Sequence, residues 1–190
     1  METAKATRLH YVVDARASRF TVQAFATGIL SAMGHNPRIG IRTFSGEVDF
    51  DAEATQAGGF RLSMKANSLG VLDDISDKDR RDIEKMMNEQ ILEPSKYPDI
   101  VYEAPTATVA RLEASLYSAT LTGTLSFHGV TRNQSVSARI AVFDEMMRAS
   151  GEFSLNQSAY GIKPISVAGG ALKVKDELKF SFEMVSRKQE

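Results

Sequence analysis

An alternation of apolar and polar side chains along several stretches limits the possible folds of this chain more than any other feature. It is clear in residues 60–66, 136–142 and 178–184, where every second residue is apolar. In the first stretch, for example, Leu62 and Met64 alternate with polar side chains. Successive side chains of a β-strand point to opposite faces, so this period places one face against a core and the other in water. The sequence therefore predicts an all-β protein.

Further strands are predicted where β-branched and aromatic residues gather. They span residues 8–14, 19–27, 39–51, 100–110 and 115–128. Many strands with short turns favour an antiparallel sheet that closes on itself, because closure removes aggregation-prone edges. A barrel of about eight strands has an interior that side chains fill or that holds one small ligand. The function of such a chain depends on whether this interior is filled or hollow.

One segment, residues 77–93, breaks the alternation and predicts a single helix in a connection between two strands. Ser76 is a suitable N-cap, the aspartates of the first turn suit the helix dipole, and Pro94 ends the helix. Its apolar residues recur at helical spacing, namely Ile83, Met86, Met87 and Ile91. We interpret this stripe as packing against the sheet, with a partner-binding surface as the alternative.

The length and the charge of the chain limit the number of domains and the kinds of binding partner that can be expected. At 190 residues the chain suits one domain with a substantial core, and we predict a single domain over residues 1–190. Its 23 Lys and Arg residues balance 24 Asp and Glu residues, which gives no electrostatic basis for general binding to nucleic acid or to an anionic membrane. The sequence has no cysteine, so disulfides, thiolate nucleophiles and Cys-based zinc sites are excluded.

Neither a membrane span nor an export signal is predicted. No apolar run approaches the roughly 20 residues that a membrane helix needs. The N-terminal stretch METAKATRLHYVVDAR lacks the apolar core of a secretory signal. We therefore expect a cytoplasmic protein if the first Met is native, and a periplasmic one if the chain has been trimmed.

The sequence contains no recognisable catalytic or metal-binding motif. The three histidines, His10, His35 and His128, are far apart and form no HExxH-type pair. No G-x-S-x-G elbow and no phosphate-binding glycine loop is present. Asp73 and Asp74 are interpreted as a solvated acidic stretch before the helix, with a glycosidase-like carboxylate pair as the alternative. We therefore predict no catalytic and no metal-ligating residues.

Two groups of basic residues leave two interpretations open. Lys163, Lys173 and Lys175 flank a glycine-rich stretch, and Arg38 and Arg42 follow a Gly-His-Asn-Pro turn. They are either ordinary surface charges or a cationic rim at the mouth of a barrel. Such a rim would bind an anionic or polar head group.

Two segments carry recognisable motifs, FSGEV at residues 44–48 and LTGTLSFHGVTR at residues 121–132. In these and in several other segments the chain resembles the YceI-like family, lipocalin-like proteins that bind polyisoprenoids and related amphiphiles. The family's F-x-G-x-V pattern is matched by Phe44–Val48, and its L-x-G-x-L-x-x-H-G-V-T-R pattern by Leu121–Arg132. The other matching segments are Tyr11–Asp14 with Ser18–Phe20, Tyr97–Ile100 and Tyr160–Glu177. In this order and spacing the matches cover about residues 10–185, nearly the whole chain.

The resemblance implies an eight-stranded antiparallel lipocalin-like barrel, with the helix packed on it and a long apolar channel inside. Each buried CH₂ group contributes about 0.8 kcal/mol, so a few isoprene units outweigh the cost of ordering a flexible tail. A register shift of one residue would exchange the two faces of a strand. The predicted channel residues on the strands are Phe20, Val22, Phe44, Val48, Leu62, Met64, Phe180 and Phe182.

Residues 28–41, GILSAMGHNPRIGI, connect two predicted strands at one end of the barrel. Pro37 prevents ordinary strand pairing there. Relatives often carry a G-H-x-H-like element at this place, and its second histidine is absent here, which argues further against a metal. We expect this segment to cover the channel with Ile29, Leu30 and Met33. The polar end of the ligand is expected to meet His35, Asn36 and Arg38.

The function that follows is non-enzymatic binding, carriage or sequestration of a polyisoprenoid, an isoprenoid quinone or a prenyl lipid, with no cofactor besides this ligand. Two alternatives stay open: a small-molecule enzyme that uses His35 at the mouth, and a protein-interaction module that uses the helix of residues 77–93. His128 is expected to bind loop backbone or a carboxylate, and Arg132 to pair with an acid. A homodimer is compatible with the sequence but not indicated by it.

Overall fold

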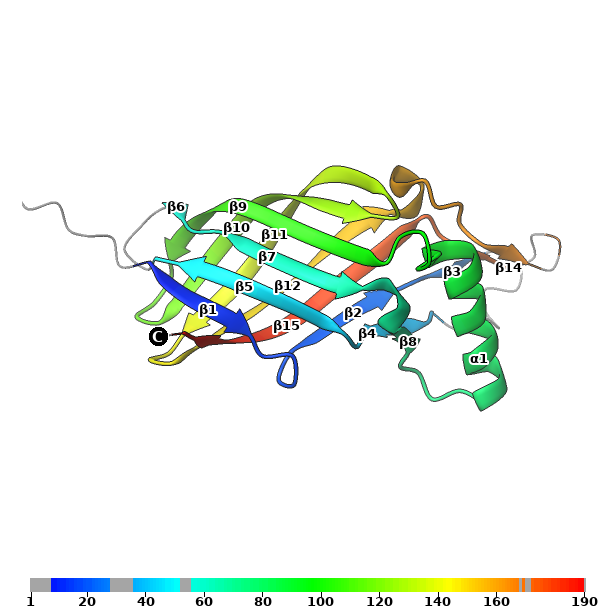
Figure 1. The fold of residues 1–190 in the computed structure, drawn as a ribbon, viewed down its shortest axis with the longest axis horizontal. Helices are drawn as coiled ribbons and strands as arrows, with labels where there is room; N and C mark the ends of the chain where they lie inside the picture. Colours follow the sequence, from blue (N-terminus) through cyan, green and yellow to red (C-terminus); the bar gives the residue numbers. More distant parts are fainter. Residues whose placement is uncertain (1–7, 28–35, 52–55, 168, 170–171, 190) are drawn as a thin grey trace, which may run out of the picture.

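The computed structural model describes residues 8–27, 36–51, 56–167, 169 and 172–189 (Figure 1). The main sheet consists of β1 (Leu9–Val13), β2 (Arg19–Gln23), β4 (Arg38–Ile41), β5 (Phe44–Phe50), β6 (Gln56–Ala57), β7 (Phe60–Lys65), β8 (Leu69–Val71), β9 (Asp99–Arg111), β10 (Leu116–Phe127), β11 (Val130–Val142), β12 (Met146–Asn156) and β15 (Glu177–Lys188). A small sheet consists of β3 (Ala26–Thr27), β13 (Ser166–Val167) and β14 (Leu172–Val174). The helical segments are η1 (Ala66–Ser68), α1 (Asp77–Met86), η2 (Met87–Leu92) and η3 (Gln157–Tyr160).

Eight antiparallel strands close into a barrel, in the order β1-β5-β7-β9-β10-β11-β12-β15, and β15 pairs with β1 to complete the ring. The alternation of the sequence produces this arrangement directly. On β7, Leu62 and Met64 are buried inside the barrel while Arg61 and Lys65 are exposed. The prediction of an all-β, lipocalin-like barrel with one helix in a strand connection is therefore confirmed.

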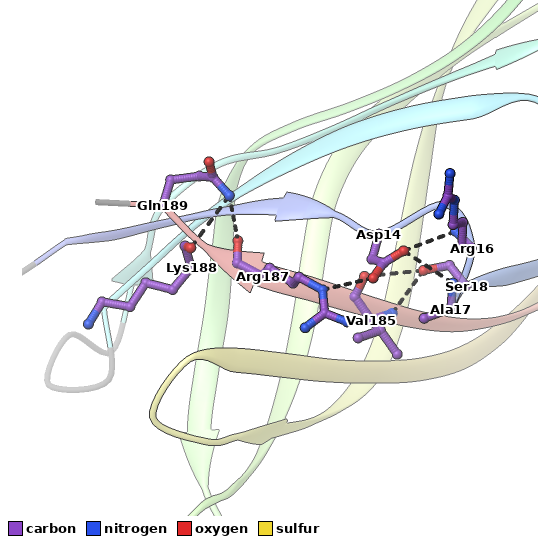
Figure 2. A network of polar contacts seen from close by, with 8 residues as sticks. All are labelled: Asp14, Arg16, Ala17, Ser18, Val185, Arg187, Lys188 and Gln189. Carbon is purple, nitrogen blue, oxygen red and sulfur yellow. Dashed lines mark hydrogen bonds and ion pairs between the residues drawn. The ribbon is translucent and has the colours of Figure 1, made fainter.

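The last strand, β15, pairs with two different strands along its length. Lys179–Glu183 pair with β2, and Ser186–Lys188 pair with β1. Between these two regions the chain turns from β1 into β2, and Ser18 takes the place of a strand neighbour (Figure 2). Its Oγ donates to the carbonyl of Val185 at 3.2 Å and accepts from the N–H of Val185 at 2.9 Å. The carbonyl also accepts from the N–H of Asp14 at 2.8 Å, so the buried hydroxyl is needed chiefly as the acceptor for the N–H of Val185 at the seam of the barrel.

A carboxylate holds the same turn in place. Asp14 accepts hydrogen bonds from Arg187 Nε at 2.8 Å and from the N–H of Arg16 at 3.0 Å (Figure 2). These bonds, that of Arg187 first, hold the pKa of Asp14 below its usual range. The ion pair ties the β1–β2 turn to the C-terminal part of β15, beside the Ser18 contact.

The helix α1 and its continuation η2 lie across the end of the barrel near β4, β8 and β14 (Figure 1). Ser76 caps the helix by accepting a hydrogen bond from the N–H of Asp79 at 3.1 Å. Glu93, with a left-handed φ of 42°, ends it just before Pro94. The predicted helix is confirmed, and its last six residues widen into a π-helix.

The helix also completes a strand edge. The main sheet ends at β8, which pairs with β4 on one side only among the described strands. The N–H of Val71 on β8 donates to Glu84 Oε1 at 2.9 Å, and the carbonyl of Val71 accepts from Arg80 Nη1. Two side chains of α1 thus replace a neighbouring strand, which protects the edge from pairing with other chains.

Two strands predicted as continuous are broken in the structure. Residues 39–51 form β4 and β5, because Ser68 binds the backbone between them and turns the chain. Its carbonyl accepts from the N–H of Arg42 at 3.3 Å, and its Oγ accepts from the N–H of Thr43 at 3.0 Å. Residues 19–27 form β2 and β3, which belong to different sheets. The described residues contain no helix that is long and apolar enough to cross a membrane.

Replacing Ser18 with alanine is expected to destabilise the fold by about 1–3 kcal/mol, because it leaves the backbone N–H of Val185 without its acceptor. Urea unfolding at constant pH measures the change. Ser45→Ala, on the exposed face of β5, is the matched control and should shift the midpoint very little. Equal stability of the two variants would contradict the role assigned to Ser18.

Candidate functional site

The barrel interior contains an apolar space of about 90 Å³, called cavity 1 here. Its wall is built from inward-facing side chains of β5, β7, β9, β10, β11, β12 and β15, with Phe20 from β2. Among them, Met147 is fully buried, and Leu62 and Tyr102 are nearly so. Burial raises the pKa of the Tyr102 phenol to about 12. Its hydroxyl is held by the carbonyl of Gln134 at 3.0 Å, so cavity 1 offers chiefly apolar contacts.

A second and larger space of about 670 Å³, called cavity 2 here, lies between the end of the barrel and the helix. The barrel wall is made by residues such as Val22, Ile39 and Leu178. The helical wall is made by the apolar stripe noted in the sequence, namely Ile83, Met86, Met87 and Ile91. The predicted packing of this stripe is therefore found, but it faces a hollow and not only side chains of the sheet.

Phe180 of β15 lines both cavities and thus stands between them. Its ring is stacked on that of Phe153, its cross-strand neighbour, at 5.0 Å between ring centroids. Phe20 and Phe182 pack beside them, with ring centroids 6.3 Å apart. A group of aromatic rings therefore separates the barrel interior from the space below the helix.

The charged residues that line cavity 2 are mostly acidic. They are four aspartates and one lysine, namely Asp73, Asp74, Asp79, Asp82 and Lys173. The interpretation of a cationic rim is wrong for this wall, since of the five basic residues considered only Lys173 contributes to it. The physical reason lies in the helix. Its first turn favours carboxylates next to the positive end of its dipole, and the helix lies across the mouth.

Several of these carboxylates are already bound. Asp73 accepts from the backbone N–H and from Nε of Arg38 at 2.7 and 3.2 Å. Asp82 pairs with Lys78 at 2.7 Å, which lowers the pKa of Asp82 and raises that of Lys78. Among the described residues, Asp74 is exposed and has no hydrogen-bond or ion-pair partner. Asp73 and Asp74 therefore do not act as a matched carboxylate pair.

One buried polar side chain belongs to the wall of cavity 2. Gln157, in the first turn of η3, is 3% exposed. Its backbone N–H donates to the carbonyl of Asp176 at 2.9 Å, and its Nε2 donates to the carbonyl of Lys175 at 3.0 Å. The sequence contains no signal for this residue, because an isolated Gln after a strand carries no recognisable pattern.

The end of the helix is attached to the β10–β11 turn by a group of polar residues. His128, with φ of 50°, places Nε2 3.1 Å from Glu93 Oε2, and Lys96 Nζ contacts the other oxygen of that carboxylate. The ring of Tyr97 packs on that of His128 at 4.3 Å between centroids. Hydrogen bonds from Lys96 and then from His128 lower the pKa of Glu93. The expected carboxylate partner of His128 is thus confirmed.

Arg132 was expected to pair with an acid, but it pairs with none among the described residues. Its Nε donates to the backbone carbonyl of Ala159, which fixes the segment that carries η3. His10 contacts Asp49 at 2.9 Å on the barrel exterior. Within the described ranges, no group of three or more His, Cys, Asp or Glu residues is arranged to hold a metal ion.

Most predicted channel residues on the strands lie at the cavities. Those at cavity 1 are Phe20, Val48, Leu62, Met64 and Phe182. Val22 lines cavity 2, and Phe180 lines both. Phe44 lines neither, but packs edge-on against Phe20 at 4.7 Å between centroids. Residues from β9 to β12 were not predicted, and they supply much of the wall, for example Leu125, Val136, Ile140 and Met147.

The predicted head-group residues are only partly described. Asn36 accepts from the N–H of Ala26 at 2.9 Å, and Arg38 is bound to Asp73, so both hold the chain at the mouth. Neither is among the residues that line cavity 2. Four predicted residues lie outside the described ranges, namely Ile29, Leu30, Met33 and His35. An enzymatic site at His35 therefore stays a prediction.

The alternative of a helix-based interaction surface loses its support. The large hydrophobic residues that are exposed, within the described part of the chain, are Leu72, Leu112 and Phe143. None of them belongs to α1 or η2, because the apolar stripe of the helix faces cavity 2.

Comparison with known proteins agrees with this geometry. The sequence matches the family model of the YceI-like domain over residues 11–186, whereas no curated protein matches it. The fold is similar to that of BcnA from Burkholderia cenocepacia, with 19% identity, coverage of 91% of this chain and 98% of that chain, and a TM-score of 0.67.

Two further solved structures share the fold. A polyisoprenoid binding domain from Saccharophagus degradans has 15% identity, covers 95% of this chain and 99% of its own, and gives a TM-score of 0.68. The YceI protein from Campylobacter jejuni has 15% identity, with 83% and 88% covered and a TM-score of 0.61. At these identities the structural similarity establishes a common fold.

Replacing Glu93 with glutamine is expected to lower the thermal midpoint at neutral pH, because the charged carboxylate bridges Lys96 and His128. The pKa of Glu93 is lowered by folding, so its charge stabilises the protein above its unfolded-state pKa and less as pH falls through the folded-state pKa. The difference from the parent protein should therefore shrink below about pH 4. Thermal scans from pH 3 to 8 test this, with Glu89→Gln on the exposed side of the helix as control. A pH-independent difference would contradict it.

Proposed function

This chain belongs to the YceI-like domain family, and on that premise we propose that it carries or sequesters a prenyl-type amphiphile, without catalysis. Membership of this family supports the binding of apolar ligands. The Saccharophagus degradans domain that shares the fold is named for polyisoprenoid binding. Candidate ligands are therefore polyisoprenoids, isoprenoid quinones and prenyl lipids.

The observation that carries the proposal is cavity 2, a space of about 670 Å³ with a mainly apolar wall. Spaces of roughly 300–1,000 Å³ bury most of a drug-sized ligand. Each CH₂ group that moves from water into such a wall contributes about 0.8 kcal/mol. Five methionines line the two cavities, namely Met64, Met147 and Met184 at cavity 1 and Met86 and Met87 at cavity 2. Their flexible thioethers adapt to an irregular chain.

The volumes of the two cavities limit the length of the ligand tail that the protein can enclose. With about 30 Å³ for each non-hydrogen atom, the share of one molecule in liquid water, cavity 2 holds roughly 20 such atoms. That corresponds to about four isoprene units of five carbons each. A longer tail has to pass the ring of Phe180 and enlarge cavity 1, whose 90 Å³ hold only a few atoms. The proposed tail contacts are thus Val22 and the helix stripe first, then Phe20, Phe180 and Phe182.

A carrier function fits the chemistry of the walls. Among the described residues, neither cavity is lined by a histidine. Asp73 and Asp82 are engaged by Arg38 and Lys78, and Asp79 accepts from the hydroxyl of Ser76 at 2.7 Å. Three of the four aspartates that line cavity 2 thus bind other side chains of the protein itself.

Native mass spectrometry of the protein after organic extraction and incubation with geranylgeraniol should show one bound molecule. Ala24→Phe, which places a ring in the wall of cavity 2, is expected to weaken this binding at least tenfold by occupying the space that the ligand needs. Ala110→Phe on the exposed face of β9 is the control. Absence of binding to a folded parent protein, or equal binding by both variants, would overturn the proposal.

Phe180→Ala should change the preference for tail length. Removing the ring joins the two cavities, so the affinity for tails of about eight isoprene units is expected to rise relative to tails of four. Displacement of the neutral fluorescent probe N-phenyl-1-naphthylamine measures both affinities. Phe143→Ala, on the exposed β11–β12 turn, is the control. An unchanged ratio of the two affinities in Phe180→Ala would contradict the proposal that the ring of Phe180 separates the two cavities.

A further inference from the structure

We propose that cavity 2 selects a ligand whose head group donates a hydrogen bond, with Gln157 Oε1 as the acceptor, and that it rejects prenyl phosphates. The selected class consists of prenyl compounds that end in a hydroxyl or an ammonium group. The inference rests on the proposed function and adds the chemistry of the head group to it.

The orientation of the Gln157 amide follows from its neighbour. The carbonyl of Lys175 is an acceptor only, so the NH₂ group of Gln157 must face it, at 3.0 Å. Because this bond fixes the amide, Oε1 is the polar atom left over. In the described part of the chain no donor binds this oxygen.

The free oxygen is open to a small group. Three polar side-chain atoms are enclosed without a partner among the described residues, namely Tyr11 Oη, Asn88 Oδ1 and Ser186 Oγ. Gln157 Oε1 is not one of them, although its residue is 97% buried and lines cavity 2. A buried acceptor that stays unpaired costs free energy, and a donor on a ligand removes that cost. The geometry therefore calls for a donor.

The charge around the mouth separates donor heads from phosphate heads. Four aspartates and one lysine line cavity 2, and its wall contains no arginine among the described residues. A diphosphate would approach these carboxylates without a bidentate cation to bind it. An ammonium group or a neutral hydroxyl meets no such repulsion.

The donor requirement is tested first on the parent protein with ligands that share a 20-carbon tail. Displacement of N-phenyl-1-naphthylamine gives their relative affinities. Geranylgeraniol and geranylgeranylamine are expected to bind about tenfold tighter than the methyl ether of geranylgeraniol, which cannot donate. Equal affinities for the alcohol and the ether would overturn this inference and leave the proposed function intact. Failure of all the compounds to bind would overturn the proposed function itself.

Gln157→Met tests whether Gln157 is the acceptor, because this change keeps the length of the side chain and removes its amide oxygen. The tenfold preference for alcohol over ether should disappear, while the affinity for the ether stays unchanged. A persistent preference in the folded variant would assign the acceptor elsewhere and overturn the role of Gln157. Should this variant not fold, Gln157→Glu provides the second readout, because a carboxylate at this place must favour the amine over the alcohol.

Asp74→Lys tests the exclusion of phosphates. Geranylgeranyl diphosphate is expected to bind the parent protein at least tenfold more weakly than the alcohol, and Asp74→Lys should reduce this difference several-fold through a change of charge at the rim. Asp144→Lys makes the same change of charge on the exposed β11–β12 turn, at the opposite end of the barrel, and should leave the difference unchanged. Equal responses of the two variants, or a diphosphate that binds the parent as tightly as the alcohol, would contradict the exclusion.

Discussion

The structure depends on the way in which β15 closes the barrel. This one strand pairs with β1 near its C-terminal end and with β2 further up, and the hydroxyl of Ser18 satisfies Val185 where the partners change. Because β2 leads on to β4 and β8, the wall has additional strands at one end of the barrel. The sheet ends there at β8, and the space beyond this edge is where cavity 2 lies.

The helix binds the backbone of β8 that has no neighbouring strand at this edge, and the same helix also forms the wall and the rim of cavity 2. Glu84 and Arg80 bind the backbone of Val71 on the edge strand, while the apolar stripe turns toward the hollow. The carboxylates that stabilise the first turns of the helix therefore lie at the rim of the same hollow. At its other end, Glu93 and His128 attach the helix to the β10–β11 turn. A single element thus serves as edge partner, cavity wall and source of the rim charge.

Much of this could be predicted from particular residues. The alternation of β7 and β15 identified inward-facing side chains such as Leu62 and Phe182, and both line cavity 1. The break between β4 and β5 had a signal as well, since the apolar period slips by one residue between Ile41 and Phe44. The burial of Gln157 had no such signal, because its hydrogen bond to the carbonyl of Lys175 and its place in the wall of cavity 2 exist only in the folded chain. Periodicity reports which face of a strand is apolar, but not which distant strand or helix meets that face.

The sequence by itself determined most of the strands, the helix and its cap, and the family, because these follow from side-chain period and from local motifs. Only the tertiary structure decided that the helix stripe borders a hollow. It also decided that the described residues at the mouth are mainly acidic and that none of them donates a hydrogen bond to the Gln157 amide oxygen. The volume of the cavity, the charge of its wall and the pairing of its polar groups depend on residues that are far apart in the sequence. They exist only once β15 has closed the barrel and the helix has covered its open end.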